Sequence, residues 1–365
     1  QRTARFYYQN HHKFLKVKKQ INKYQLPKMQ KILVTGGLGF IGSHTVVELQ
    51  NEGFEVVIID DLSNTTIDVL DKITEITGTK PAFHKVDVRV KSEVKAVFDA
   101  HKIDGIIHFA AFKAVGESMS KPLDYYENNL SSLIYILQEM RDRKLDNFIF
   151  SSSCTVYGQA DELPITEKAP IKAAESVYGN TKQIGEEIIR DASNAHGLNC
   201  IALRYFNPIG AHPSIKIGEL PLGVPQNLIP FITQTAAGIR KELSVFGDDY
   251  PTVDGTAVRD YIHVVDLGKA HIAALSRLIK KNNKKSFEYF NIGTGNGSSV
   301  LEIINTFEKA NNLKLNYKIV GRREGDVVAA YADTTIANKE LNWKTEIGLE
   351  EALESAWKWQ QKQSV

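Results

Sequence analysis

The chain has 365 residues, of which 42% are hydrophobic and 24% charged, and its formal net charge is +2. This length fits one large domain or two unequal lobes with a substantial core, and no apolar run approaches the roughly 18–20 residues that a membrane helix needs. The two cysteines, Cys154 and Cys200, show no CxxC spacing, so neither a disulfide framework nor a metal site is predicted. The composition is typical of a soluble enzyme, for which we expect a cytoplasmic location.

Residues 1–28 carry eight basic and no acidic side chains, which leaves 37 of the 45 basic and all 43 acidic residues, a net charge of −6, for the rest of the chain. Three interpretations of this basic extension stay open: a transit peptide, a nucleic-acid-binding arm, or a disordered or non-native segment upstream of a natural start at Met29. We favour the last, because MQKILVTGG begins a strand directly at Met29. The mildly acidic remainder argues against nucleic acid as a partner.

A first strand is predicted at residues 31–35, followed by a glycine-rich turn and a helix. Gly36, Gly39 and Gly42 are spaced G-x-x-G-x-x-G at this turn. Glycines there let the backbone approach a pyrophosphate, whose charge is met by free N–H groups at the helix start. The next strand, FEVVIID, ends at Asp60, whose carboxylate can accept from a ribose 2′-hydroxyl and would repel a 2′-phosphate. The pattern therefore predicts a site for NAD rather than NADP.

Strands and helices continue to alternate after Asp60. PAFHKVDV predicts a strand ending at Asp87, KSEVKAVFDAHK a helix, DGIIHFAAFKAV a strand running into a loop, and PLDYYENNLSSLIYILQEMRDRK one long amphipathic helix. This alternation specifies an α/β fold with a doubly wound parallel (Rossmann) sheet, in which ligands bind beyond the carboxyl ends of the strands. Several residues at or beyond such ends are predicted to face the cofactor, with Asp87 on the adenine side: Asp87, Ala110, Ala111, Lys113, Asn128 and Asn129. His108 is more consistent with a packed strand-end residue than with a catalyst.

The catalytic candidates lie in the next strand and helix. Ser153 closes the apolar strand NFIFSSS, and Tyr178 and Lys182 are four residues apart in a helix that Ser176 opens, so they share one face. A tyrosine is a poor base at neutral pH because its pKa is about 10. A nearby ammonium, together with a nicotinamide cation, favours the phenolate. The three side chains therefore predict a proton relay for oxidising a secondary alcohol beside a hydride acceptor.

Longer sequence blocks carry a resemblance to a known family. GGLGFIGSHT, HFAAFKAVGES, SSSCTVYG, the YGNTK helix, LRYFNPIGAHP, FGDDYPTVDGTAVRDYIHVVDL and REGD resemble the UDP-glucose (UDP-galactose) 4-epimerases of the extended short-chain dehydrogenase/reductase superfamily, from Met29 to about Gln360. The related 4,6-dehydratases and UDP-sugar decarboxylases have acidic residues just after the position of Ser153. Cys154 and Thr155 stand there in this chain, so the carboxylates for an elimination step are missing.

The resemblance implies a mainly NAD-binding domain at 29–205 and, at 206–365, a mainly UDP-sugar-binding lobe with some chain returning to the first domain. In the first domain it implies further cofactor contacts, with Tyr205 beside the nicotinamide: Phe40, Ile41, Asn64, Val88, Phe109, Ser151 and Tyr205. In the substrate site it places Lys113, Ser153, Tyr178, Phe206 and Asn207. Of the remaining substrate candidates, Asn227 and Leu228 are diphosphate contacts, Phe246 faces the uracil, Arg259 and Arg323 bind the diphosphate, and Asp326 contacts the uridine ribose.

These positions also have plainer interpretations. Asp260 beside Arg259, or Glu324 beside Arg323, could form an ordinary surface ion pair. NIGTGNGSS looks like a second phosphate loop, but we interpret it as a structural turn because its helix lies in the C-terminal lobe.

Ala330 departs from the commonest bacterial pattern of the family, in which a tyrosine closes the pocket beside the sugar 2-position. Smaller residues there accompany acceptance of N-acetylated sugars. We hypothesise that Ala330 leaves room for an acetamido group, so that UDP-GlcNAc and UDP-GalNAc are also substrates. Tyr331 follows directly, and a shift of one residue in the ungapped register would reverse this hypothesis.

The resemblance predicts an NAD-dependent isomerase of galactose metabolism that acts through a transient 4-keto sugar with tightly bound NAD, and it suggests a homodimer packed through helices of the cofactor domain. Two other classes remain open. An NAD-dependent dehydrogenase or reductase of a nucleotide sugar would use the same relay and release its cofactor. A non-enzymatic NAD-sensing protein would not need Ser153, Tyr178 and Lys182.

Overall fold

The computed structural model describes residues 29–323 and 326–363. The basic extension 1–28, about which three interpretations were open, lies outside the described residues, as does Glu324. None of the described helices combines the length and the apolar character that crossing a membrane requires.

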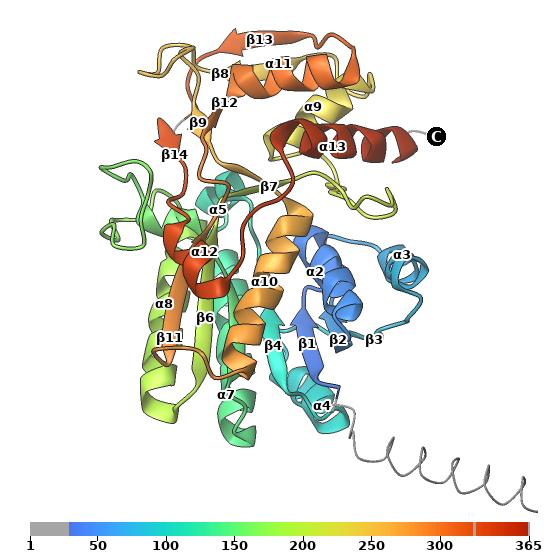
Figure 1. Ribbon diagram of the computed structural model, residues 1–365, viewed down its shortest axis with the longest axis vertical. Coiled ribbons are helices and arrows are strands. Elements are labelled where there is room, and N and C mark those ends of the chain that lie inside the picture. The colour runs from blue at the N-terminus through green and yellow to red at the C-terminus, as the bar shows by residue number, and fades with distance from the viewer. Residues whose placement is uncertain (1–28, 324–325, 364–365) are drawn as a thin grey trace, which may run out of the picture. The chain divides into compact units, whose positions relative to one another are not determined.

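A parallel sheet of seven strands forms the centre of the fold, in the order β11-β6-β5-β4-β1-β2-β3 (Figure 1). Every neighbouring pair in this sheet is parallel. Its members are β1 (Lys31–Thr35), β2 (Glu55–Asp60), β3 (Ala82–Lys85), β4 (Gly105–His108), β5 (Asn147–Ser153), β6 (Asn199–Tyr205) and β11 (Phe287–Ile292). The predicted doubly wound Rossmann fold is confirmed, although β3 ends two residues before the predicted end at Asp87.

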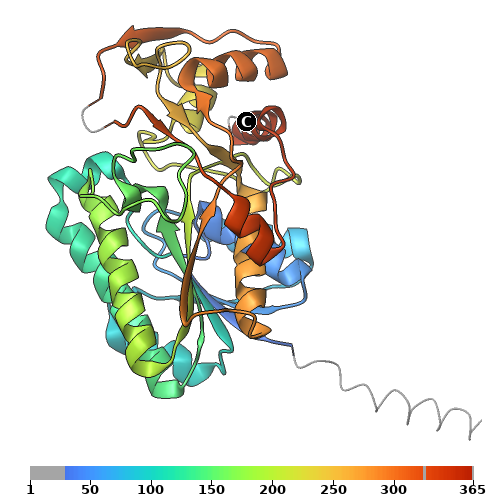
Figure 2. The same cartoon turned by 60° about the vertical axis from the view of Figure 1, so that its left-hand side comes forward.

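Helices cover both faces of the sheet, which Figure 2 shows in profile. One face carries α2 (Phe40–Asn51), α3 (Asp68–Thr77), α10 (Val264–Ile279) and α12 (Thr335–Leu341), and the other α4 (Lys91–Ala100), α7 (Ser132–Arg143) and α8 (Val177–His196). Successive strand residues alternate between the two cores: Ile32 and Val34 pack on the first face and Leu33 on the second. Continuous apolar strands are the pattern expected where both faces of a parallel sheet are buried.

The predicted long helix at 122–144 is interrupted by a wider turn. It consists of α6 (Pro122–Tyr126), a π-helical turn η1 (Glu127–Ser131) and α7, and it follows the short α5 (Val115–Ser120). Asn128 and Asn129 lie in the π-helical turn, and both are buried. Such turns insert one extra residue and re-aim side chains, often at functional sites.

The chain leaves the sheet after β6 and builds a smaller lobe beyond the carboxyl ends of the strands (Figure 1). Its strands are β7 (Asn207–Ile209), β8 (Leu243–Phe246), β9 (Val258–Arg259), β10 (Tyr261–His263), β12 (Ser298–Ser299), β13 (Tyr317–Val320) and β14 (Ala329–Ala330). Its helices α9 (Leu228–Ala236), α11 (Val300–Asn311) and α13 (Leu349–Gln363) enclose a separate core around Phe307 and Leu353. We propose the boundary after Tyr205 as the division between the lobes, with α10, β11 and α12 returning to the first.

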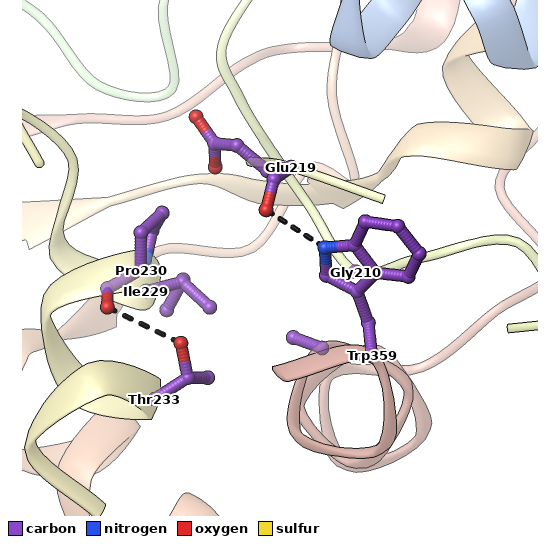
Figure 3. Close-up of a pocket in the computed structure, with 7 residues that line it drawn as sticks. Gly210, Glu219, Ile229, Pro230, Thr233 and Trp359 are labelled. Carbon is purple, nitrogen blue, oxygen red and sulfur yellow. Dashed lines mark hydrogen bonds between the residues drawn. The ribbon is translucent and has the colours of Figure 1, made fainter. Parts of the chain in front are cut away.

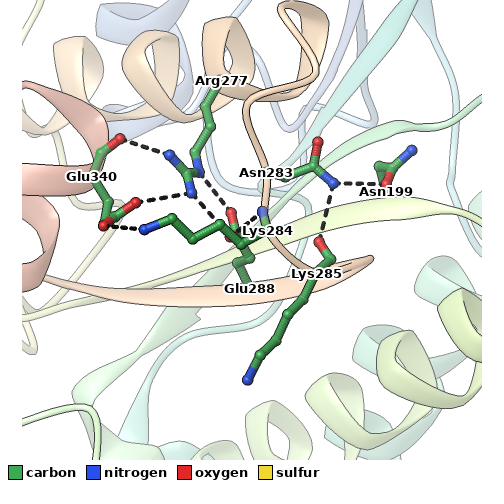
Figure 4. A network of polar contacts seen from close by, with 7 residues as sticks. All are labelled: Asn199, Arg277, Asn283, Lys284, Lys285, Glu288 and Glu340. Atoms are coloured by element: carbon green, nitrogen blue, oxygen red, sulfur yellow. Dashed lines mark hydrogen bonds and ion pairs between the residues drawn. The ribbon is translucent and has the colours of Figure 1, made fainter.

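Arg277 fastens this returning chain to the sheet edge (Figure 4). Its Nε and Nη2 donate to the carboxylate of Glu288 in β11, at 2.7 and 3.0 Å, and Nη2 also donates to Glu340 of α12 at 3.1 Å. Lys284 donates to the other oxygen of Glu340 at 2.5 Å. The fork geometry of a guanidinium lets one side chain join α10, β11 and α12.

Candidate active site

The turn between β1 and α2 has no room for a side chain at Gly36 or Gly42. Gly36 has φ +67°, and a Cβ on Gly42 would lie 2.2 Å from the carbonyl oxygen of Gly36. Gly39 immediately precedes α2, and within the described residues no side chain caps the N–H groups at the start of this helix. The turn therefore keeps the N-terminus of α2, including Phe40 and Ile41, open to an anion at the carboxyl end of β1.

This turn lies where the strand order reverses. β1 pairs with β2 on one side and with β4 on the other, so the connections from the two strands run to opposite faces of the sheet. Open parallel sheets bind ligands in the crevice at such a point.

Asp60 ends β2 beside the glycine turn. Its Oδ2 accepts from the backbone N–H of Leu38 at 3.1 Å, and its Oδ1 accepts from that of Leu62 at 3.0 Å. Burial raises the pKa of this carboxyl, and the two N–H donors act in the opposite direction. Each carboxylate oxygen keeps a second lone pair, so Asp60 can still accept from a ribose hydroxyl.

Three predicted cofactor contacts, Asp87, Val88 and Asn64, differ in exposure. Asp87 is half-buried and paired with Arg89, whose hydrogen bonds lower the pKa of the Asp87 carboxyl. Val88 is buried next to it, whereas Asn64 is exposed in the loop after β2. These three residues lie just beyond the ends of β2 and β3, and Asp87 is partly engaged by its neighbour Arg89.

The end of β4 is organised by Thr35. The Thr35 hydroxyl contacts Nδ1 of His108 at 2.8 Å and accepts from the N–H of Ala110 at 3.1 Å. His108 stacks on Phe150, and burial lowers its pKa to about 3. A buried neutral imidazole between strands is a packed residue, which agrees with the prediction from the sequence. Phe109, Ala110 and Ala111 are half-buried beyond the strand end.

Asn129 shapes the loop that follows. Its Oδ1 accepts from the N–H of Phe112 at 2.8 Å, and its Nδ2 donates to the carbonyl of Phe112 at 3.0 Å and to the hydroxyl of Thr181 at 3.0 Å. Asn128 donates to Asn129 Oδ1 at 2.9 Å. Asn129 is therefore a structural link between this loop and α8.

The three catalytic candidates converge at the end of β5. Helix α8 begins as predicted, because the Ser176 hydroxyl accepts from the N–H of Gly179 at 3.0 Å. Lys182 Nζ donates to the carbonyl of Ser151 at 2.7 Å and lies 5.7 Å from the ring centroid of Tyr178. A hydrogen bond with Ser153 acts on the phenol of Tyr178. The three side chains predicted to form a relay thus lie close together and come from two elements, β5 and α8.

Burial dominates the ionisation of this cluster. It raises the pKa of Tyr178, which the hydrogen bond with Ser153 only partly counteracts, and it lowers the pKa of Lys182 to about 7. The residues of the chain alone therefore favour the neutral phenol, and the phenolate needs a further positive charge at the site. Tyr205 lies alongside, with its hydroxyl 2.5 Å from Oγ of Ser151, and burial raises the pKa of Tyr205 to about 12.

The candidates for the uridine end also come together. Asp326 accepts from Arg259 in a short ion pair and lies 3.3 Å from Nη2 of Arg323. The guanidinium of Arg323 is 5.9 Å from the ring centroid of Phe246, whose side chain is 43% exposed. Two guanidinium groups, one carboxylate and one exposed aromatic ring form a surface suited to a phosphorylated nucleoside.

Cys154 directly follows Ser153 of the relay. Its pKa is raised to about 12, mainly by burial, and the charge of Arg259 acts on it. Cys154 also acts on the pKa of Tyr178. Cys154 and Val327, which directly follow Ser153 and Asp326, pack against the same apolar cluster, so the relay and the uridine end are neighbours.

The suggested surface pair between Arg259 and Asp260 is wrong. Asp260 is fully buried and accepts from the N–H groups of Thr294, Gly295 and Ala332 at 2.8–3.2 Å. Arg259 turns to Asp326 instead. Asp260 thus engages two N–H donors of NIGTGNGSS, those of Thr294 and Gly295, and Ser299 caps α11. The structural-turn interpretation of that motif agrees with this geometry.

Glu219, which the sequence analysis did not single out, contacts two predicted substrate-binding residues, Asn227 and Lys113. Oε1 of Glu219 accepts from Nδ2 of Asn227 at 2.8 Å and lies 3.5 Å from Nζ of Lys113. Leu228 begins α9 directly after Asn227. The only sequence signal was an acidic residue in the Pro- and Gly-rich stretch GELPLG.

Ala330 and Tyr331 point to different surroundings. Ala330 is buried in a small apolar cluster with Phe206, Tyr157 and Ile165. The ring of Tyr331 packs instead on Gly297, where an added Cβ would lie 2.9 Å from it. Alternation along the extended chain at β14 thus separates the two side chains, with Ala330 on the side of Phe206. Asn207 is half-buried next to Phe206, where its N–H donates to the carbonyl of Asp260 at 3.0 Å.

Comparisons with known proteins show the family to which the chain belongs. The family model of GDP-mannose 4,6 dehydratase matches residues 33–356. A UDP-glucose 4-epimerase of Drosophila melanogaster is 48% identical over 336 residues, which are 90% of this chain and 96% of that protein. The chain belongs to this family, and within it to the UDP-glucose 4-epimerases.

Solved structures of epimerases match the fold closely. The UDP-glucose 4-epimerase of Stenotrophomonas maltophila, with bound NAD and formylated UDP-arabinopyranose, has a TM-score of 0.88 and 46% identity, covering 92% of this chain and 99% of that one. The enzyme of Bifidobacterium longum, in complex with NAD+ and UDP, has a TM-score of 0.87 and 46% identity, covering 91% and 98%.

The family model is named after a dehydratase, but this chain lacks the acidic residues that the related dehydratases have directly after the position of Ser153. Cys154 and Thr155 follow directly, in the short 3₁₀ helix η2 (Cys154–Tyr157), and neither carries a carboxylate. The residues present at this point of the site suit an epimerase.

Proposed function

We propose that the protein interconverts UDP-glucose and UDP-galactose by oxidation and reduction at the sugar C4. The observation that carries this proposal is the convergence of Ser153, Tyr178 and Lys182 at the sheet edge that also holds the glycine turn, next to the cluster of Arg259, Arg323 and Asp326. Membership of the epimerase family supports it.

NAD is the cofactor that the residues fit. The glycine turn admits a pyrophosphate against the start of α2, and Asp60 offers its carboxylate to a ribose. Lys182 and Tyr205 would flank the nicotinamide end, and Asp87 the adenine end. When bound, NAD supplies the acceptor for the hydride from the sugar C4. It also carries a positive charge that favours ionisation of the buried Tyr178 phenol.

The residues of the chain then handle the proton. Tyr178, as phenolate, removes the proton from the sugar 4-hydroxyl, and Ser153 hydrogen-bonds the same oxygen. Lys182, held by the carbonyl of Ser151, contributes a nearby ammonium that favours the phenolate. The 4-keto sugar turns over within the site and regains its hydrogen on the other face, so net redox is zero.

Anchoring at the nucleotide permits that rotation. Arg259 and Arg323 would bind the diphosphate, Phe246 the uracil and Asp326 the ribose, while Asn207, Asn227, Leu228 and Lys113 line the path to the sugar. Because most of the binding contacts are made with UDP, the hexose can turn while the nucleotide stays in place. Ligand binding requires the guanidinium groups to exchange part of their contact with Asp326 for phosphate oxygens.

The protein is further proposed to act as a cytoplasmic homodimer in galactose metabolism. Both cysteines are free thiols, which suits a reducing compartment. Met119 and Leu123, in α5 and α6 of the cofactor domain, are 60% and 79% exposed and would be covered by a partner copy. Light scattering after size-exclusion chromatography should give twice the chain mass, and a monomer at micromolar concentration would reject the dimer.

A second substrate class is favoured by Ala330. This small side chain lies against Phe206, and Tyr331 is directed to Gly297, so the aromatic ring does not fill the space on the Ala330 side. We expect an acetamido group to be accepted there, and hence turnover of UDP-GlcNAc and UDP-GalNAc. Comparing turnover of UDP-galactose and UDP-GalNAc tests this: no detectable activity on UDP-GalNAc would reject it.

A further inference from the structure

Glu219 joins side chains from the two lobes. Lys113 follows β4 in the cofactor domain, whereas Asn227 precedes α9 in the substrate lobe, and both contact the same carboxylate oxygen. The side chain of Glu219 is only 13% exposed, while that of Lys113 is 52% exposed. A mostly covered carboxylate holds its donors firmly, because losing them would leave a poorly solvated charge.

Helix α13 fixes the backbone that carries Glu219. The indole N–H of Trp359 donates to the carbonyl of Glu219 at 2.9 Å (Figure 3), and the indole ring covers Gly218, where an added Cβ would lie 2.5 Å from it. One turn earlier on the same helix face, the hydroxyl of Ser355 accepts from the N–H of Ala211 at 3.0 Å. Ala211 and Gly218 pair as an antiparallel bridge, so α13 holds both sides of this loop.

Glu219 is the last firmly held residue before an exposed stretch. Leu220, Leu222 and Val224 are 45–61% exposed, and regular structure resumes only after Asn227. The hydrogen bond between Glu219 and Asn227 therefore closes this stretch at its two ends. Without it, the exposed Asn227 amide would depend on a loop with few packing contacts.

We propose that Glu219 is a positioning residue of the substrate site, which holds the Lys113 ammonium and the Asn227 amide together for the diphosphate of a nucleotide sugar. The inference rests on the proposed function, in which both donors contact the substrate. Ordering a lysine and an exposed loop before binding reduces the entropy lost on binding. The carboxylate and the Lys113 ammonium neutralise each other, so the attraction for the diphosphate comes mainly from Arg259 and Arg323.

Binding of UDP alone is the direct test, because it does not depend on epimerase activity. Titration calorimetry on the full chain should show UDP binding to Glu219→Ala weakened about tenfold. Glu219→Gln keeps an acceptor for Asn227 but loses the ion pair, so the loss should be smaller. The control is Glu242→Gln, which removes an ion pair with Lys318 at 2.7 Å elsewhere in the same lobe and should leave the affinity unchanged. Unchanged or tighter binding by Glu219→Ala would overturn the proposal.

Combined substitutions distinguish a positioning role of Glu219 from a general structural role, because they show whether its effect on UDP binding depends on Asn227 and Lys113. If Glu219 acts through Asn227 and Lys113, adding Glu219→Ala to the Asn227→Ala, Lys113→Met double variant should weaken UDP binding no further. Trp359→Phe keeps a ring over Gly218 but loses the N–H donor, and it should weaken binding a few-fold through Glu219. With UDP-galactose, KM should rise in parallel with the dissociation constant while kcat changes less than about threefold.

The controls exclude a folding defect. The melting temperatures of all variants are compared with that of the wild-type protein. If Glu219→Ala has a clearly lower melting temperature, the same binding measurements are made on Glu219→Gln, alone and combined with Lys113→Met. An additive loss in the combined variants, or a fall in kcat with KM unchanged, would contradict a positioning role. If wild-type protein binds UDP without epimerising, the proposed function fails, and the effect of Glu219→Ala on UDP binding still decides whether Glu219 positions the two donors.

Discussion

At the scale of single residues, the proposed reaction depends on the phenol of Tyr178, which burial keeps protonated. The pKa of Tyr178 is raised, and Lys182 is engaged by the carbonyl of Ser151 rather than by the phenol itself. Positive charge from a bound nicotinamide would shift this balance toward the phenolate only when the cofactor is in place. Such an arrangement confines base strength to the loaded site.

Replacing Tyr178 by phenylalanine should abolish most of the turnover and leave the cofactor bound. The ring still packs, but the acid–base group is lost, which costs on the order of 10²–10⁴-fold in rate. Turnover of UDP-galactose and the NAD released on denaturation are measured on the same preparation. Near-normal turnover would contradict the assignment of Tyr178 as the base.

The buried ammonium of Lys182 predicts a pH dependence of stability. Its pKa falls from an unfolded value near 10.5 to about 7 in the folded chain, so between these values the unfolded chain binds more protons. The destabilisation is therefore fully present below about pH 7 and is relieved as pH rises toward 10.5. In chemical unfolding of cofactor-free protein, the wild type should gain up to roughly 1.4 kcal/mol per pH unit over Lys182→Met in this window. A difference between the two proteins that stays constant from pH 7 to 10 would refute the prediction.

At the scale of elements, the sequence predicted the parallel sheet and the positions of the turn and helix that begin the two main parts of the site. Glycine spacing placed the turn before α2, and the cap at Ser176 placed the start of α8, because both signals are local in the chain. The alternative in which Arg259 pairs with Asp260 is excluded for a local reason too, because neighbouring residues of an extended segment point to opposite sides. The π-helical turn at 127–131 has no distinctive local signature, and it was missed inside an otherwise regular amphipathic pattern.

The Arg277 network makes the attachment of α12 and β11 testable. Arg277→Ala would leave the carboxylate of Glu288, only 10% exposed, without its guanidinium, which should cost about 3–5 kcal/mol of unfolding free energy. The matched control is Lys269→Ala, whose ion pair with Glu346 is 42% and 61% exposed and should contribute less than about 1 kcal/mol. Urea unfolding gives the free energy of unfolding of both variants. Equal losses would show that the network in Figure 4 stabilises the protein no more than an exposed ion pair does.

At the scale of the whole molecule, the site is built from segments far apart in the chain. The resemblance to the epimerases supplied Arg259, Arg323, Asp326 and Phe246 as separate candidates, and the structure brings them into one cluster. Glu219 could not be found in this way, because its contact with Lys113 spans 106 residues and belongs to no local motif. Long-range pairs of this kind become visible only once the two lobes are folded against each other.

The most direct measurement of the central claim uses purified protein with UDP-galactose and no added NAD, and follows UDP-glucose formed and NADH released. The account predicts UDP-glucose without net NADH, because the hydride returns to the same sugar and the cofactor stays bound. Stoichiometric NADH would contradict it and move the chain to the nucleotide-sugar dehydrogenases. If protein that retains NAD forms neither UDP-glucose nor NADH, this result would contradict the assignment of UDP-galactose as a substrate.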